Sequence, residues 1–168
     1  MDYRILGPLE VCPEGGPVGL GGDKQRALLA ILLLHRGEVV SADRLIDELW
    51  GERPPPTALK ALQVHVSRLR RALSRDGDSA TGARDGVLVT RGHGYLLRVE
   101  PGELDVDRFR GLLDEGRKTL VAGDPDRAAR VLRDALALWR GPPLADFTYE
   151  TFAQQAIAEL EELHVGAI

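Results

Sequence analysis

Basic side chains gather in one segment of the 168-residue chain, and their chemistry suits the binding of phosphate groups. Residues 53–75 carry a local charge of +6 and no acidic side chain; the basic residues are Arg53, Lys60, Arg68, Arg70, Arg71 and Arg75. Lysine and arginine neutralise phosphates, and arginine also reads guanine through two parallel hydrogen bonds. The segment is therefore a candidate nucleic-acid contact, with a solvated helix face as the ordinary alternative.

The spacing of apolar residues in this segment predicts a helix from about Thr57 to Leu73. One buried stripe is expected, because its residues follow at intervals of three and four: Leu59, Leu62, Val66, Leu69 and Leu73. The exposed side carries the residues that we predict to contact DNA: Thr57, Lys60, Val64, His65, Ser67, Arg68 and Arg71. Arg70 lies at the flank, and we expect it to pair with an acid of the preceding helix such as Asp47.

Strand-like residues 87–90 and 95–99 follow the basic helix, and Arg91-Gly92-His93-Gly94 joins them. The glycines permit a tight hairpin, whose tip adds Arg91 and His93 to the predicted DNA contacts. A basic helix followed by such a hairpin is the arrangement of a winged helix-turn-helix. Its helix fits the major groove, and its hairpin can reach an adjacent groove or the backbone.

Other elements are predicted on both sides of this motif. Before it, the alternation of residues 3–11 predicts a strand, and residues 18–20 are expected to form a second short strand. One helix is expected to begin near residue 24 with Asp23 as its N-cap, and a second helix is expected to follow the N-cap Ser41. Residues 76–86 are expected to form a mobile loop. Helical patterns cover about 105–122, 125–139 and 150–164, and the first two are typical of one tetratricopeptide-type unit. Both tryptophans, Trp50 and Trp139, are interpreted as core anchors.

Charge and composition narrow the function classes. The net charge of −4 divides into +2 over residues 1–98 and −6 over 99–168, so the acidic total hides a basic first half. No membrane span or secretory signal is expected. Cys12 alone cannot make an internal disulfide framework, and the four histidines lack ligand spacing. We find no nucleophile–base–acid pattern, and we predict neither an enzyme nor a cofactor or metal site.

Two motifs identify a family resemblance for the first part of the chain. Residues 64–71, Val-His-Val-Ser-Arg-Leu-Arg-Arg, and 90–95, Thr-Arg-Gly-His-Gly-Tyr, resemble the OmpR-type winged-helix signature over about residues 3–99. The resemblance implies a small sheet before the first helix and DNA reading by the third. It assigns DNA contacts to His65, Arg68 and Arg71, and a backbone or minor-groove contact to Arg91. The usual N-terminal receiver domain of that family is not part of this sequence.

The second part of the chain resembles the bacterial transcriptional activation domain. The similarity lies in residues 105–109, 122–124 and 135–145, the last reading Ala-Leu-Ala-Leu-Trp-Arg-Gly-Pro-Pro-Leu-Ala. The combined layout is similar to that of the Streptomyces antibiotic regulatory protein (SARP) family. The expected fold is an α+β winged helix over residues 1–99, then an all-α, tetratricopeptide-like domain over 100–168. The activation domain is expected to be partial, in a fragment or a short member.

The resemblance implies a transcriptional activator in the cytoplasm, associated with the nucleoid. Its expected partners are double-stranded promoter DNA with direct repeats, on which it would bind as a dimer, and RNA polymerase holoenzyme. Its expected targets are genes of antibiotic biosynthesis. The alternative is a protein-interaction scaffold, in which the winged helix and the acidic helices dock partner proteins.

Overall fold

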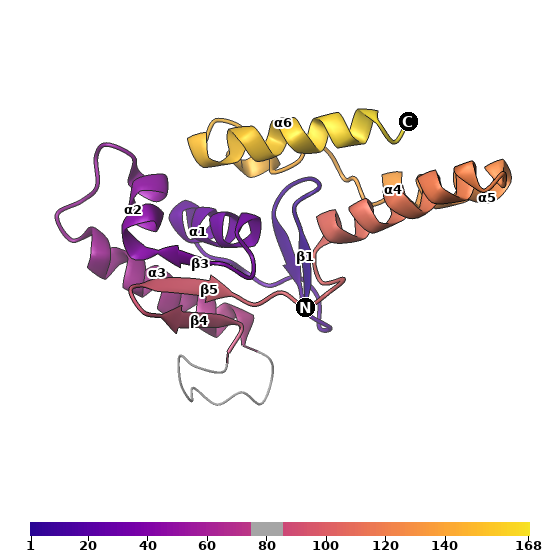
Figure 1. The fold of residues 1–168 in the computed structure, drawn as a ribbon. Helices are drawn as coiled ribbons and strands as arrows, with labels where there is room; N and C mark the ends of the chain where they lie inside the picture. Colours follow the sequence, from indigo (N-terminus) through magenta and orange to yellow (C-terminus); the bar gives the residue numbers. More distant parts are fainter. Residues whose placement is uncertain (75–85) are drawn as a thin grey trace. The chain divides into compact units, whose positions relative to one another are not determined.

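The structure, a computed structural model, describes residues 1–74 and 86–168. The chain divides into two compact units, namely Gly15–Val99, and Met1–Glu14 together with Glu100–Ile168 (Figure 1). Arg75 and the expected loop at residues 76–86, apart from Gly86, lie outside the described residues. The first fourteen residues thus group with the helical half, whereas the predicted division placed them with the winged helix. The functional limits 1–99 and 100–168 stay a prediction.

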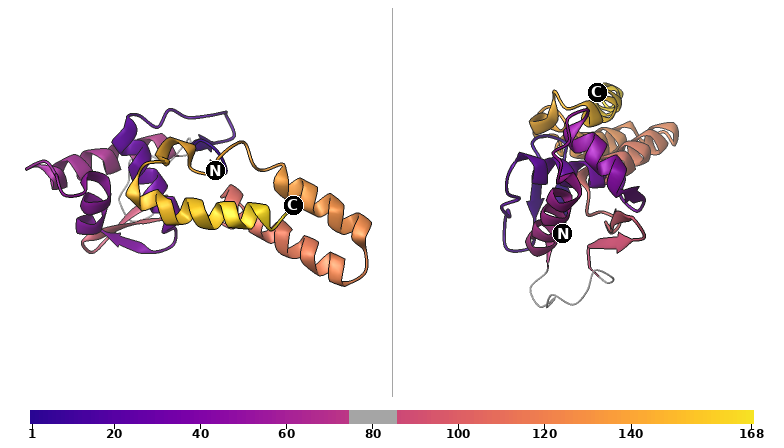
Figure 2. Two further views of the ribbon diagram at one scale, coloured as in Figure 1. Left: turned by 90° about the horizontal axis from the view of Figure 1, so that it is seen from above. Right: turned by 90° about the vertical axis from the view of Figure 1, so that its left-hand side faces the viewer.

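The unit Gly15–Val99 is a winged helix, and this prediction is confirmed. Its elements are α1 (Asp23–Leu34), β3 (Val39–Ser41), α2 (Ala42–Trp50), α3 (Ala58–Leu73), β4 (Leu88–Arg91) and β5 (Gly94–Leu97), shown in Figures 1 and 2. The strands form an antiparallel sheet in the order β3–β5–β4. Strand β3 was not predicted, because three residues are too few to carry a pattern. The strand expected at residues 18–20 is wrong, since these residues lie outside the strands.

Of the two N-caps predicted in this unit, one is confirmed and the other is wrong. Ser41 caps α2 as predicted, because its Oγ accepts a hydrogen bond from the Arg44 backbone N–H at 3.2 Å. Gly22 rather than Asp23 occupies the N-cap of α1. Asp23 is instead the first helical residue, where its charge still favours the positive end of the helix dipole.

The buried side of α3 positions its outer side. The buried residues are Ala58, Leu62, Val66, Leu69 and Leu73. The expectation that Leu59 would join them is wrong, because its side chain is 53% exposed. Leu59 lies in the first turn of the helix and roughly 60° around the axis from Leu62, so Ala58 completes the stripe instead.

Gly94 sits where the wing sheet meets the backbone of β3. A Cβ atom at this position would lie 2.4 Å from the Val40 carbonyl oxygen, and Gly94 is the register partner of Ser41. A side chain therefore cannot be added without moving a strand. At the neighbouring Gly92, φ is +55° and nothing lies within 4 Å of an added Cβ, so only the backbone conformation restricts that residue.

Replacing Gly94 with alanine should destabilise the winged-helix unit by about 2–3 kcal/mol, because backbone atoms rather than flexible side chains oppose the new methyl group. Urea unfolding followed through Trp50 fluorescence, in a Trp139→Phe background, would measure this unit. Gly92→Asn is the matched control, since asparagine tolerates a positive φ. An unchanged unfolding midpoint for Gly94→Ala would contradict the geometry.

The other unit combines a hairpin with helices. Strands β1 (Asp2–Arg4) and β2 (Glu10–Cys12) pair antiparallel, so the single strand expected over residues 3–11 is wrong: the chain reverses between them. The helices are α4 (Asp105–Val121), α5 (Pro125–Leu136), the short 3₁₀ helix η1 (Ala145–Phe147) and α6 (Thr151–Val165). Helix α5 ends three residues earlier than predicted. The pair α4–α5 is antiparallel and close, since a Cβ on Gly116 would lie 2.6 Å from the Leu132 side chain.

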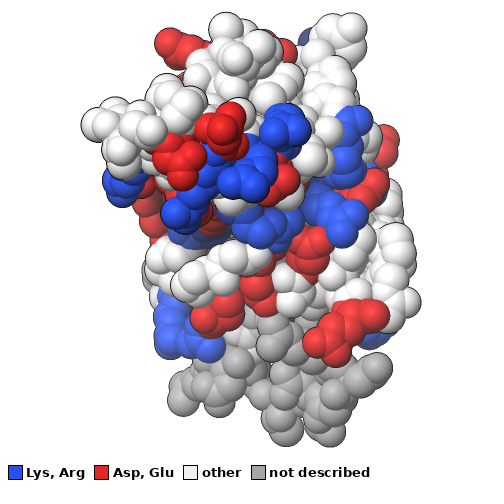
Figure 3. All heavy atoms as spheres, turned by 90° about the vertical axis from the view of Figure 1, so that its right-hand side faces the viewer, with Lys and Arg blue, Asp and Glu red and all other residues white. Residues whose placement is uncertain are grey.

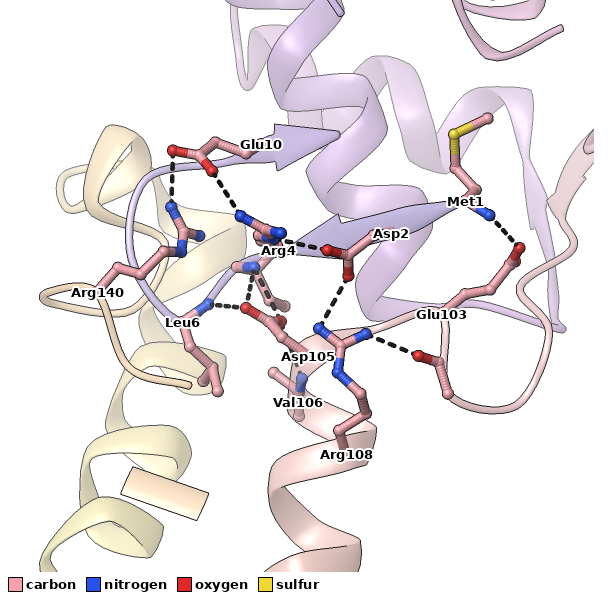
Figure 4. A network of polar contacts seen from close by, with 12 residues as sticks. Met1, Asp2, Arg4, Leu6, Glu10, Glu103, Asp105, Val106, Arg108 and Arg140 are labelled. Carbon is pink, nitrogen blue, oxygen red and sulfur yellow. Dashed lines mark hydrogen bonds and ion pairs between the residues drawn. The ribbon is translucent and has the colours of Figure 1, made fainter. Parts of the chain in front are cut away.

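A buried carboxylate joins the hairpin to the start of α4. Asp105 is 2% exposed, and its oxygens accept hydrogen bonds from the backbone N–H groups of Ile5 (2.9 and 3.0 Å), Leu6 (2.9 Å) and Val106 (2.9 Å), as Figure 4 shows. Burial raises the pKa of Asp105, against the opposing effect of these hydrogen bonds. The first residue of the motif at 105–109 is therefore a structural anchor.

The Trp-Arg-Gly-Pro-Pro-Leu run closes over the same hairpin. Arg140 pairs with Glu10 at 2.9 Å and donates to the Pro8 carbonyl at 2.8 Å. Leu144, at a φ of +50°, donates its N–H to the Ile5 carbonyl at 2.8 Å. Trp139 is half-buried, stacked on His164 with ring centroids 4.1 Å apart. These residues hold the unit together, which explains why the run has so distinctive a composition.

Candidate nucleic-acid interface

The outer face of α3 presents the predicted contacts together. Lys60, Val64, Ser67, Arg68 and Arg71 are exposed, and so is Thr57 at the N-cap. They share this face because the helical spacing that buries the apolar stripe turns the intervening positions outward. The exposed face offers cations for phosphates, and shorter side chains that can approach base edges.

His65 lies at the edge of this face and differs from its neighbours. It is half-buried, and its ring centroid lies 6.4 Å from that of Trp50 on α2. Burial lowers the pKa of His65 below its usual value, and the positive charges of Arg68 and Lys24 lower it further. The imidazole is therefore mostly uncharged near pH 7, and its buried Nδ1 has no hydrogen-bond partner among the described residues. Trp50 is also half-buried and packs beside it.

The wing carries the two other predicted residues. Arg91 ends β4 and His93 follows Gly92 in the turn, and both are exposed. The tip of the wing is held by α2, because the His93 carbonyl accepts a hydrogen bond from the Ala42 N–H at 2.9 Å. The start of α2 and the tip of the wing are thus fixed to one another.

Arg70 contradicts its predicted role. Instead of pairing with Asp47, it donates from Nε to the Leu88 carbonyl at 2.9 Å and from Nη2 to Thr90 Oγ1 at 2.7 Å. Its guanidinium carbon also lies 6.0 Å from the centroid of the Tyr95 ring. Sequence reasoning missed this arrangement because the wing strands begin 18 residues later in the chain. Its position at the flank of the helix was the available signal.

The net charges of the two compact units differ more than the net charges of the two halves of the sequence. Residues 15–99 hold 13 basic and 9 acidic side chains, a net charge of +4, which leaves −8 for the hairpin–helical unit. In the latter unit, opposite charges pair, as in Lys118–Asp114 at 2.5 Å and Arg127–Glu115 at 3.2 Å. On the face drawn in Figure 3, blue and red side chains also lie next to one another. The stretch 53–75 has no acidic side chain to neutralise its cations.

The described part of the chain offers neither a metal site nor a membrane span. Within residues 1–74 and 86–168, no three His, Cys, Asp or Glu side chains gather as a metal site requires. Among the helices in the described ranges, none has the length and apolar character needed to cross a bilayer. The outer face of α3 with the wing is therefore the best-supported candidate site.

Two sequence families match this chain. Residues 18–97 match "Transcriptional regulatory protein, C terminal", and residues 104–168 match "Bacterial transcriptional activator domain". The chain is 37% identical over 169 residues to the regulatory protein DnrI of Streptomyces peucetius, and 36% identical over 168 residues to the transcriptional regulator RedD of Streptomyces coelicolor. All of this chain aligns in both cases, and it spans 62% of DnrI and 47% of RedD.

A solved structure agrees with these relatives. The structure of Mycobacterium tuberculosis EmbR in complex with a low-affinity phosphopeptide superposes with a TM-score of 0.89 at 37% identity, over 99% of this chain and 43% of EmbR. The named relatives are transcriptional regulators, a non-enzymatic class. With its OmpR-type winged helix followed by a bacterial transcriptional activator domain, the chain belongs to the SARP family of transcriptional regulators.

Proposed function

We propose that the chain is a sequence-specific transcriptional activator whose winged helix binds promoter DNA. The observation that carries this proposal is the exposed, acid-free face of α3, with the exposed Arg91 on a wing that is hydrogen-bonded to the same helix. A helix with cations on its outer side fits the major groove, and a wing arginine reaches the backbone or the minor groove.

The proposed contacts divide by chemistry. Lys60 and Arg71 neutralise phosphates and fix the orientation of the protein on the duplex. Arg68 reads a guanine edge, and Val64 packs on a thymine methyl group. Thr57 and Ser67 hydrogen-bond to phosphates or bases, together with His65 as a neutral group, and His93 accompanies Arg91 on the wing. The contacts with base edges supply specificity, and the contacts with phosphates supply affinity.

The hairpin–helical unit is proposed to act on the transcription machinery. Two copies bind side by side on direct repeats and recruit RNA polymerase holoenzyme at the nucleoid, to genes of secondary metabolism such as antibiotic biosynthesis. Support comes from the family and from the net charge of −8, which makes this unit a poor DNA ligand and leaves it for protein contacts.

Binding to the promoter region upstream of the protein's own gene, cut into labelled duplexes, tests the proposal. The logarithm of the affinity should fall linearly with the logarithm of salt concentration, by about 0.9 per phosphate contact. Sedimentation should give two protein chains on a duplex with two direct repeats and one on a duplex with a single repeat. A flat salt dependence would contradict DNA binding.

The second candidate function is a protein-interaction scaffold. Five large, exposed apolar side chains of the hairpin–helical unit favour it, namely Leu120, Val121, Tyr149, Val165 and Ile168. Scattered exposed apolar residues are common on protein surfaces, so they support the second function less strongly than the basic face supports the first. Failure to retard any promoter duplex at low salt would make the scaffold the better account.

A further inference from the structure

One arginine of the basic segment is turned away from the face that meets DNA. Arg70 is half-buried, whereas the neighbouring Arg68 and Arg71 are exposed. Its three partners all belong to the wing strands: the Leu88 carbonyl and Thr90 Oγ1 on β4, and the Tyr95 ring on β5. The guanidinium is planar with donors in fixed directions, so two hydrogen bonds and a ring contact restrict its position and rotation together.

The position of β4 in the sheet explains why the Leu88 carbonyl is available to Arg70. Strand β4 lies at the edge of the sheet in the described part of the chain. The Val87 carbonyl accepts a hydrogen bond from the Arg98 N–H at 2.8 Å, just beyond β5. Because hydrogen-bonded positions alternate along an antiparallel pair, the carbonyl of the next residue, Leu88, faces outward, and it accepts from Arg70. Leu88 and Val89 pack into the core, and Arg70 adds side-chain hydrogen bonds from α3 to this edge of the wing.

Thr90 links the Arg70 contact to Arg91, the predicted DNA contact of the wing. It directly precedes Arg91, so fixing its side chain against α3 restricts the backbone from which Arg91 projects. We propose that Arg70 is a positioning residue, which sets the wing against α3 so that Arg91 and the outer face of α3 engage one duplex together. This inference rests on the proposed DNA binding, and it assigns no DNA contact to Arg70 itself.

The physical reason for such a device is preorganisation. A wing free to swing would lose conformational freedom on binding DNA, and this loss would offset the contact made by Arg91. A wing already held at the right angle avoids most of that cost. Arg70 would therefore raise affinity through Arg91, and removing either residue should remove much the same binding energy.

A double-mutant cycle tests this coupling in the full chain. On the cognate duplex, Arg91→Ala should weaken binding about tenfold, the scale of one charged DNA contact. In a Thr90→Val background the same change should cost less than about threefold, because the wing is already loose. Thr90→Ser, which keeps the hydroxyl acceptor, should restore the full effect of Arg91→Ala. Equal effects of Arg91→Ala in the wild-type and Thr90→Val backgrounds would overturn the inference.

Variants of Arg70 separate positioning from charge. Arg70→Lys keeps the positive charge but loses the two-bond geometry, and it should behave like Arg70→Gln. The salt dependence of DNA binding by both Arg70 variants should be close to that of Arg91→Ala. If Arg70 were a phosphate contact, Arg70→Lys would retain most of the binding, and the loss in Arg70→Gln would add to that of Arg91→Ala. That additive pattern would also overturn the inference.

A measurement without DNA keeps the two proposals distinct. Amide hydrogen exchange in β4 and β5 should be faster in Thr90→Val and in Arg70→Lys than in wild type, while exchange in α4 should be unchanged as an internal control. Unchanged exchange in the wing would refute the positioning role even if DNA binds. Faster exchange in a protein that binds no promoter duplex would instead leave the positioning role standing and reject the proposed function.

Discussion

Replacing Arg68 with glutamate should weaken binding to the cognate promoter duplex by about 100-fold or more. The change removes one guanidinium contact with a base, and it places an anion beside phosphates on a face that has no acid. Fluorescence anisotropy at fixed salt would measure the loss. Arg130→Glu on α5 is the matched control, because the residue is exposed and the charge change is the same. We expect it to alter affinity less than about threefold, because Arg130 is not among the predicted DNA contacts and salt screens charges that do not touch the duplex.

A lysine at the same position separates base reading from charge. Arg68→Lys keeps the cation but cannot make the two parallel hydrogen bonds to guanine. Affinity for unrelated duplexes should therefore stay near that of wild type, while the preference for the cognate duplex falls by roughly 1–3 kcal/mol. Equal losses on cognate and unrelated DNA would show that Arg68 touches only phosphate.

Asp105→Asn should destabilise the hairpin–helical unit by about 2–4 kcal/mol. The carboxylate accepts the N–H groups of Ile5, Leu6 and Val106 with both oxygens, whereas an asparagine amide offers one oxygen and turns an N–H₂ group toward a donor. Each buried donor left without a partner costs roughly 1–3 kcal/mol. Urea unfolding followed through Trp139 fluorescence, in a Trp50→Phe background, reports on this unit.

Asp134→Asn serves as the control for that measurement, because Asp134 is exposed on α5 and its neutralisation should change stability by about 0.5 kcal/mol or less. An Asp105→Asn protein as stable as the control would show that the buried carboxylate is not the anchor of the hairpin. DNA binding offers a second reading, since the winged-helix unit has its own core. The affinity of this unit for DNA is therefore not expected to fall in parallel with the stability of the hairpin–helical unit.

The same residue predicts a dependence on pH. Burial raises the pKa of Asp105 above its ordinary value of 3.8, so the folded chain holds the proton more tightly than the unfolded chain. The extra stability that comes from the bound proton is therefore complete below about pH 4 and is lost as the pH rises through the raised pKa, which leaves the contribution of the hydrogen bonds to the carboxylate. The difference in unfolding free energy between wild type and Asp105→Asn should shrink over that range. A constant difference would contradict the raised pKa.

Local patterns predicted more of the winged helix than of the hairpin–helical unit. The apolar spacing of α3, the glycines of the wing turn and the cap at Ser41 are each contained within a few residues, and the structure has all three. The capping of α5 by Asp124, whose side chain accepts from the Arg127 N–H at 3.0 Å, is of the same kind. The exposed face of α3 follows directly from this spacing. Its role in DNA binding stays a prediction.

Two of the errors arose where residues take their partners from elsewhere in the chain. Residues 3–11 alternate as one strand would. The chain nevertheless reverses within them, where the N–H groups of Ile5 and Leu6 donate to Asp105, which lies 100 residues from Ile5 in the sequence. Strand β3 exists because β5 pairs with it, since its three residues carry too short a pattern to be seen alone. No periodicity within a window of ten or twenty residues contains such information.

By itself, the sequence determined most of the side chains that face outward on α3, with Leu59 as an exception, and it determined which turn forms the wing, because helical spacing and glycine turns are properties of neighbouring residues. It also determined the family, through motifs that lie contiguous along the chain. Only the tertiary structure decided that Arg70 holds the wing rather than an acid of α2, and that the first fourteen residues join the acidic helices. Those outcomes depend on which hydrogen-bond partner is nearest in space, and folding alone brings such partners together.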